Sequence, residues 1–264
     1  KRREFEFKKM TDAQVLAKKR RTQVYLDMWK EVFSHPSEKL HLVFVSNSLF
    51  TEACNDVGSA PTTGRYSIIH NYIDGQRFPY FEKSAEHRKK ILSIRPFSGL
   101  KYANDLSAAA IVELSRQPYF SDLQFTIVGM GELFDEETAP LRGFNNVTLE
   151  NKFLNHEEIS LLHRSHGVFL NPTRWDSQGV SRDEAMASGL VPITSANSAV
   201  PEFVDEDCAI LAEDGDHMGL AEGIHELFLD ADRFSSMSLA ASERVRRQSG
   251  FEQTIAREIA VITG

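Results

Sequence analysis

The sequence predicts an α/β protein built on a doubly wound, mostly parallel sheet, preceded by a partial α/β segment. From residue 41 onward, short apolar runs alternate with helical patterns, which is typical of repeated βα units. A polar stretch at 71–89, with Gly75 and Pro79, divides this alternation into two series. The chain of 264 residues is 41% hydrophobic and 26% charged, an average soluble composition that excludes collagen-like, disulfide-rich and most disordered proteins.

The expected elements follow one another in a regular order. Short apolar runs predict strands at 41–46, 66–70, 90–95, 124–129, 146–150, 167–171, 190–195 and 208–212. Helical patterns lie between most of them, most clearly at 101–117, 155–165, 181–189, 217–230, 231–248 and 251–262. Asn155, followed closely by two glutamates, indicates a capped helix start, and Gly189 indicates a helix end in the left-handed conformation.

The two series of elements differ in size. The second, 88–250, contains six strands and predicts a complete doubly wound domain, which the C-terminal helix at 251–264 follows. The first contains two strands, so 1–87 is expected to be the end of a truncated domain with its linker, or an appendage. Because the first residue is not Met, we expect a piece of a longer polypeptide.

The distribution of charge along the chain limits the kinds of partner that the protein can have. Residues 1–30 hold ten Lys and Arg against four Asp and Glu, so the total charge of −8 leaves about −14 on the rest. An acidic body argues against nucleic acid as the main partner. The stretch at 8–30 predicts a helix with a basic face, compatible with peripheral membrane association or, more simply, with a solvated helix packed on other protein.

Several features that are missing from the sequence bear on the cellular location of the protein and on metal binding. There is no apolar run long enough to span a bilayer and no signal-peptide core at the start. Cys54 and Cys208 have neither metal-ligand nor disulfide-framework spacing. The sequence therefore predicts a cytoplasmic protein without a metal site.

The first candidate for chemistry is the loop after the strand at 90–95. Open parallel sheets bind ligands at the carboxyl ends of their strands. Here Arg95 and Lys101 lie on a loop that opens a helix, and two cations beside a helix N-terminus suit a diphosphate. Ordinary surface charge explains the same pair equally well.

A glycine pair follows the next strand. Gly129 and Gly131 would let the backbone approach a ligand closely, although a tight turn would also explain them. The dinucleotide fingerprint requires a third glycine where this chain has Phe134. A dehydrogenase is therefore disfavoured.

The strongest candidate is the segment 171–195, a strand, a polar loop, a helix and another strand. Asp176 in the loop and Glu184 in the first turns of the helix are eight residues apart, so one acid could face the outer end of a ligand and the other its hydroxyls. Backbone amides at 178–181 point into the same space and could bind phosphate. Alternatively, Asp176 forms a turn, and Asp183 and Glu184 are acids that the helix dipole favours.

The segment "NPTRWDSQGVSRDEAMASGLVPITS" resembles the Glu-x7-Glu segment of retaining GT-B glycosyltransferases of family 4, also called glycosyl transferases group 1, which are glycogen-synthase-like. The residues in register are Pro172, Thr173, Gly179, Glu184, Ala185, Met186, Ala187, Gly189, Val191 and Pro192. Four further motifs follow in the family's order: "VFVSNSLFTEAC", "HNYIDGQRF", the Arg95 and Lys101 pair, and "IVGMGE". The resemblance covers about 41–250 and implies a Rossmann-like donor-binding domain, the C-terminal half of a GT-B fold.

The resemblance also implies roles for individual residues. Arg95 and Lys101 would hold the donor diphosphate, and Glu184 the ribose hydroxyls. The remaining expected positions are backbone amides of Gly179, Val180 and Ser181 at the phosphates, Asp176, Ser177 and Gln178 at the donor sugar, and Gly129, Gly131, Phe153 and Leu154 near the base. Asp176 replaces the family's Glu, Ser177 replaces the first loop Gly, and the Arg-to-Lys spacing is one residue longer. No catalytic residue can be named.

For the whole protein, the resemblance implies a metal-independent transferase without a cofactor. It would move a hexosyl or deoxyhexosyl group from a nucleotide diphosphate sugar to a glycan or lipid-linked acceptor, which the rest of the acceptor domain would bind. Bacterial surface polysaccharide synthesis, at the inner face of the membrane, is the expected setting. Two alternatives are a GT-B nucleotide-sugar epimerase, which would need a His/Asp/Glu set in the cleft, and a non-catalytic nucleotide-sugar-binding module.

Overall fold

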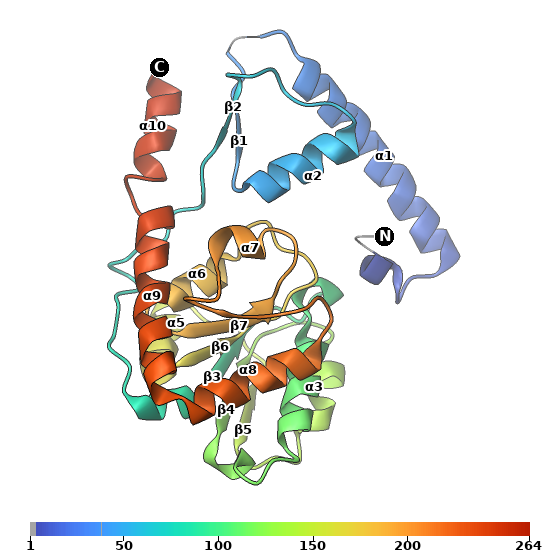
Figure 1. The fold of residues 1–264 in the computed structure, drawn as a ribbon. Helices are drawn as coiled ribbons and strands as arrows, with labels where there is room; N and C mark the ends of the chain where they lie inside the picture. Colours follow the sequence, from blue (N-terminus) through green and yellow to red (C-terminus); the bar gives the residue numbers. More distant parts are fainter. Residues whose placement is uncertain (1–3, 38) are drawn as a thin grey trace.

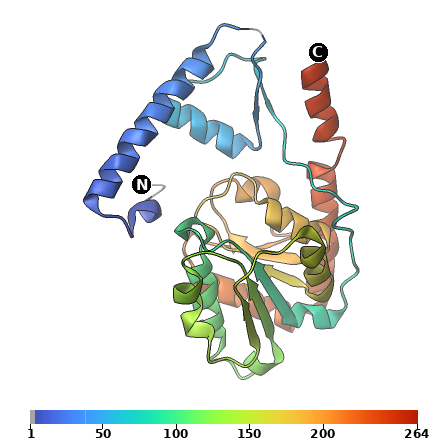
Figure 2. The ribbon, with the colours of Figure 1, turned by 180° about the vertical axis from the view of Figure 1, so that it is seen from behind.

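The computed structural model describes residues 4–37 and 39–264. The N-terminal segment begins with a single 3-10 turn, Glu4–Phe7, and continues through α1 (Asp12–Ser34), β1 (Leu42–Phe44), α2 (Asn47–Val57) and β2 (Tyr66–Ile68). β1 and β2 pair in parallel as a two-stranded sheet. In the views of Figures 1 and 2, this segment lies above a larger domain that contains a second sheet.

The larger domain contains a six-stranded parallel sheet, so the predicted doubly wound fold is confirmed. Its strands are β3 (Lys90–Ile94), β4 (Gln124–Val128), β5 (Val147–Glu150), β6 (Val168–Leu170), β7 (Val191–Ser195) and β8 (Ile210–Ala212). The spatial order is β5-β4-β3-β6-β7-β8, with every neighbouring pair parallel. The order reverses between β3 and β6, and ligands of such sheets bind in the crevice at this reversal.

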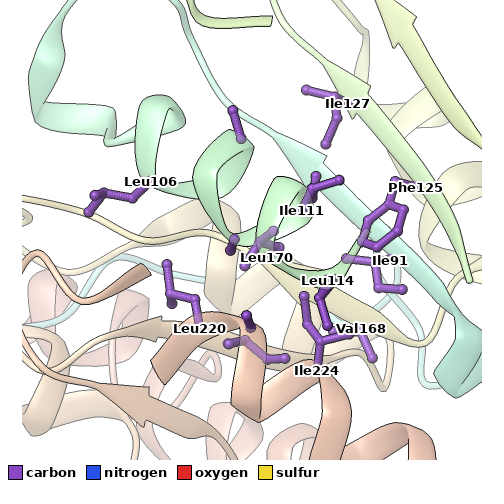
Figure 3. Packing of buried hydrophobic residues seen from close by; sticks show 14 of the residues in the cluster. Ile91, Leu106, Ile111, Leu114, Phe125, Ile127, Val168, Leu170, Leu220 and Ile224 are labelled. Carbon is purple, nitrogen blue, oxygen red and sulfur yellow. The ribbon is translucent and has the colours of Figure 1, made fainter. Parts of the chain in front are cut away.

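Helices cover both faces of this sheet. Their bounds are α3 (Asn104–Leu114), α4 (Phe134–Thr138), α5 (His156–Ser165), α6 (Val180–Ala187), α7 (Val200–Phe203), α8 (His217–Leu229) and α9 (Ala231–Ser249). The last helix, α10 (Ile255–Thr263), buries none of its residues and lies outside the sheet domain in Figures 1 and 2. Strand residues alternate between the faces: Ile91 packs with α3 and α8, whereas the next residue, Leu92, packs with Ala185 of α6. Figure 3 shows Ile111 of α3 and Ile224 of α8 in the first of these clusters.

Local signals in the sequence set several element ends. The Asn155 side chain accepts a hydrogen bond from Glu158 N and thereby caps α5, as expected. Gly189 has a φ of 87° just beyond α6. The helix predicted from residue 101 begins instead at Asn104, because Leu100–Tyr102 form a separate 3-10 turn and Ala103 has a φ of 52°.

The polar stretch between the two sheets has neither helix nor strand from 69 to 84, and it packs on the larger domain. Ile73 and Phe78 are buried in a cluster with residues of α6, α7 and α9. β3 begins at Lys90 and α9 ends at Ser249, while the domain boundaries themselves stay predictions. No helix within the described ranges is both long and apolar enough to cross a bilayer.

Candidate functional site

The candidate site lies at the carboxyl ends of β3 and β6, where the strand order reverses. Arg95 directly follows β3, and the loop from Asn171 to Gly179 joins β6 to α6. The tertiary fold therefore brings together two segments that are about eighty residues apart in the chain.

The guanidinium of Arg95 is buried and has few protein partners. The residue is only 5% exposed, and its Nη2 donates one long hydrogen bond, 3.5 Å, to Pro172 O. Its Nε has no hydrogen-bond partner among the described residues. Burial lowers the pKa of Arg95, while the Asp176 carboxylate acts in the opposite direction. A buried cation with unused donors is suited to an anionic ligand.

Lys101 is exposed on the turn between β3 and α3. Its Nζ lies 4.8 Å from the centre of the Tyr102 ring, and the Arg95 guanidinium lies 5.2 Å from the same ring. The structure therefore gathers both predicted cations on one aromatic side chain, which the sequence analysis missed. Lys101 also lines a cavity of about 580 Å³ together with residues of the N-terminal segment, including Lys9 and Lys18.

Asp176 is half-buried and also forms a turn. Its Oδ1 accepts a hydrogen bond from Gln178 N at 3.2 Å, and its own N donates to Ser198 Oγ at 3.0 Å. Asp176 also lies close enough to Arg95 to affect its pKa. The turn-forming reading is thus correct, and contact of Asp176 and its half-buried neighbour Ser177 with a donor sugar stays a prediction.

The Gln178 side chain is buried and hydrogen-bonded within the protein. It is 1% exposed, accepts hydrogen bonds from Asn71 N and Nδ2 at 2.7 and 3.0 Å, and donates to Asp183 Oδ2 at 3.1 Å. A buried amide needs all these partners, so the side chain joins the linker to α6. The backbone N and O of Gln178 are bonded as well, to Asp176 Oδ1 and Arg182 Nη2, so the expected contact of its side chain with a donor sugar is corrected.

The start of α6 combines free amides with a buried ion pair. Gly179 has a φ of 94°, and no side chain among the described residues caps the helix there, so the amides of Val180 and Ser181 are available to a ligand. Arg182 and Asp183 are both 1% exposed and paired at 2.6 Å, which neutralises their charges. Binding of phosphate by these amides stays a prediction.

Glu184 is the half-buried carboxyl of the site. Burial and the neighbouring Asp183 raise its pKa to about 7, while Arg77 acts in the opposite direction. Within residues 4–37 and 39–264 its carboxyl has no hydrogen-bond partner. A carboxyl held in this way suits a ligand with hydroxyl groups, such as a ribose.

The glycine pair has a packing explanation. A Cβ on Gly129 would lie 1.8 Å from Arg95 O, and one on Gly131, whose φ is 155°, would lie 2.2 Å from the carbonyl carbon of Phe97. The two loops therefore approach each other through these glycines. Of the other two residues expected near the base, Phe153 is 80% exposed, whereas the side chain of Leu154 is buried at 6% and lies with the core.

Contacts between the N-terminal segment and the site were missed by the sequence analysis. Trp175 Nε1 donates to Glu52 Oε2 at 2.7 Å, and the Glu202 carboxylate accepts from the amides of Asn47 and Ser48 at 2.8 and 3.0 Å. These contacts carry no local sequence signal because the partners are far apart in the chain. No group of three or more His, Cys, Asp or Glu side chains in the described part of the chain is arranged to hold a metal ion.

The solved structures that share this fold include the following three. Sucrose-phosphate synthase from Thermosynechococcus elongatus is 18% identical, with a TM-score of 0.68 over 84% of this chain and 57% of that protein. A TarM variant from S. aureus, solved with fondaparinux, alpha-GlcNAc-glycerol and UDP, is 13% identical, with a TM-score of 0.69 over 85% of this chain and 44% of that protein. Anabaena HepE, solved with UDP and glucose, is 14% identical, with a TM-score of 0.66 over 84% and 62%.

The chain thus spans less than two thirds of each of these three proteins. At such identities the likeness concerns the fold. No curated protein matches the sequence. The model of the glycosyl transferases group 1 family matches residues 89–230, more than half of the chain and nearly all of the six-stranded domain. The chain therefore belongs to the glycosyl transferases group 1 family.

Proposed function

We propose that this chain is the donor-binding part of a retaining glycosyltransferase that uses a nucleotide diphosphate sugar. The observation that carries the proposal is the buried Arg95 guanidinium, whose Nε has no partner among the described residues, at the reversal of the strand order. A buried cation whose donors are not all hydrogen-bonded costs free energy, and a bound diphosphate would offset that cost.

The other residues of the site would bind different parts of the same ligand. Lys101, on the ring that Arg95 also contacts, adds a second cation for the diphosphate. The Glu184 carboxyl, which no described residue hydrogen-bonds, would accept hydrogen bonds from the ribose hydroxyls, and the exposed ring of Phe153 would stack on the base. Asp176 would contact the sugar.

The proposed mechanism rests on positioning and charge. As the bond between sugar and diphosphate breaks, negative charge accumulates on the departing diphosphate. Arg95, Lys101 and the free amides at the start of α6 would stabilise this charge. No step is assigned to a nucleophile, a base, a metal or a cofactor.

The acceptor side belongs to the proposal as well. We place a glycan or lipid-linked acceptor opposite the donor, bound by further protein of the GT-B type, in surface polysaccharide synthesis on the cytoplasmic side of a membrane. Two of the similar structures were solved with UDP, one together with glucose and the other with alpha-GlcNAc-glycerol, which makes UDP and a hexosyl group the first ligands to try.

Calorimetric titration of the chain with UDP, GDP, ADP and dTDP tests the donor site. One diphosphate should bind selectively. Glu184→Ala should reduce its binding free energy by about 1 to 3 kcal/mol, the usual loss for a charged hydrogen-bond partner. Glu243→Ala, which removes an exposed glutamate of α9, is the control and should leave the affinity unchanged. An unaltered affinity in Glu184→Ala would remove Glu184 from the ribose site.

Turnover distinguishes an enzyme from a binding module. The matching nucleotide sugar is incubated with glycan acceptors, and the product is analysed by NMR for the configuration of the new bond. A product with the donor's anomeric configuration supports a retaining transferase. Binding of the nucleotide sugar without transfer would support a non-catalytic module instead.

A further inference from the structure

The turn that carries Lys101 is held by the loop that follows β6. The backbone N of Arg174 donates to Lys101 O at 2.9 Å, and Thr173 Oγ1 donates to the same carbonyl at 3.2 Å. Arg174 Nη1 donates to the preceding carbonyl, Leu100 O, at 2.7 Å. Two consecutive carbonyls of the turn therefore depend on two consecutive residues of a loop more than seventy positions away.

The Arg174 side chain is itself fixed at its far end. Its Nη1 and Nη2 bind the two carboxylate oxygens of Asp105 at 2.8 and 2.6 Å. Asp105 lies in the first turn of α3, directly after the Lys101 turn. A two-pronged contact between a guanidinium and a carboxylate fixes both distance and orientation, and the Arg174 side chain is only 14% exposed.

The turn needs such support because its backbone is strained. Ala103 is buried and has a φ of 52°, a left-handed conformation that is unfavourable for a residue with a Cβ. Strained residues of this kind persist only where the surroundings fix them, often at ligand sites. Arg174 connects to both sides of Ala103, through Leu100 O before it and Asp105 after it.

We infer that Arg174 is a positioning residue for the donor diphosphate: through the turn and Asp105 it holds Lys101 beside Arg95 on the Tyr102 ring. This inference rests on the proposed function, because it gives Lys101 a phosphate to bind. Arg174 acts through Lys101, so its loss should affect phosphate contacts and leave the ribose and base contacts unchanged.

The test uses Arg174→Gln in the 264-residue chain, with the selected nucleoside diphosphate and its nucleoside as ligands. We expect about tenfold weaker binding of the diphosphate, the order of one charge-assisted contact, and unchanged binding of the nucleoside. Amide exchange at Tyr102 and Ala103, which donate to Gly99 O and Leu100 O, should accelerate.

Three further variants separate positioning from general damage. Arg116→Gln removes another arginine that is paired with an acid of α3, but on the exposed surface, and should change neither ligand. Arg174→Lys, which keeps the charge and loses the planar fork, should fall between wild type and Arg174→Gln. In a Lys101→Ala background, Arg174→Gln should have no additional effect on the diphosphate affinity.

The outcomes distinguish this inference from the proposed function. If the wild-type chain binds no diphosphate, the proposed function fails, and the inference fails with it. If wild type binds but Arg174→Gln retains full affinity, or loses diphosphate and nucleoside affinity equally, the inference alone is overturned. A further loss in the Lys101→Ala background would also overturn it.

Discussion

Trp175 donates its indole N–H to a carboxylate oxygen of Glu52, 2.7 Å away, across 123 residues of sequence. This contact joins the loop residue next to Asp176 to α2 of the N-terminal segment. Glu52 is 7% exposed, so the indole N–H stabilises a carboxylate that water barely reaches.

Replacement of Trp175 by Phe should weaken this connection. The aromatic bulk is largely kept, while the buried carboxylate of Glu52 loses the indole N–H. We expect the free energy of unfolding to fall by about 1 to 3 kcal/mol, the usual cost of removing one partner of a buried charged group. Urea denaturation measures the change. A Trp29→Phe variant, which alters an exposed tryptophan of α1, is the control.

Loss of Lys101 should discriminate between ligands. Lys101→Ala should weaken the binding of nucleoside diphosphates and leave the binding of the free nucleoside unchanged, since the ligand group proposed for Lys101 is the phosphate. The loss should be about 1 to 3 kcal/mol and should shrink at high salt. Titrations at two salt concentrations measure it, with Lys30→Ala of α1 as control. Equal losses for both ligands would place Lys101 outside the phosphate site.

A methyl group at residue 129 should disturb both the fold and the site. The Cβ of Gly129→Ala would lie 1.8 Å from Arg95 O, so the two loops must separate. We expect about 1 to 3 kcal/mol lower stability, the usual cost of overpacking, together with weaker diphosphate binding. Gly143→Ala is the matched control, because its Cβ would meet nothing within 4 Å. Equal melting temperatures for the two variants would contradict this packing.

Glu137 should make stability depend on pH. Burial, together with the nearby Asp105, raises its pKa from 4.5 to about 7. The folded state therefore binds more protons than the unfolded state between these values, so the contribution of Glu137 to stability falls as pH rises from 4.5 to 7. Glu137→Gln should therefore have a higher free energy of unfolding than wild type above pH 7, and this difference should be smaller near pH 4.5. Denaturation midpoints across the range check the sign, and a constant difference would refute it.

The sequence by itself determined the local structure of this protein. Apolar runs with β-branched residues predicted all eight strands. The polar side chain of Asn155 begins one helix, and Gly189, which has no side chain, follows the end of another. Each of these signals acts within a few residues. The sequence also placed Arg95, Lys101, Asp176 and Glu184 after strands or at a helix start, where a parallel sheet binds its ligands.

Only the tertiary structure decided which of these side chains are hydrogen-bonded within the protein and which are open to a ligand. Gln178 appears in the same motif as Asp176, yet its amide is bound to Asn71, 107 residues earlier, and is buried. Arg174 looks like ordinary surface charge until Asp105, 69 residues away, and the Leu100 carbonyl are seen beside it. Partners that meet only when β3 and β6 become neighbours leave no periodic pattern in the chain, because hydrogen bonding and burial depend on distance in space.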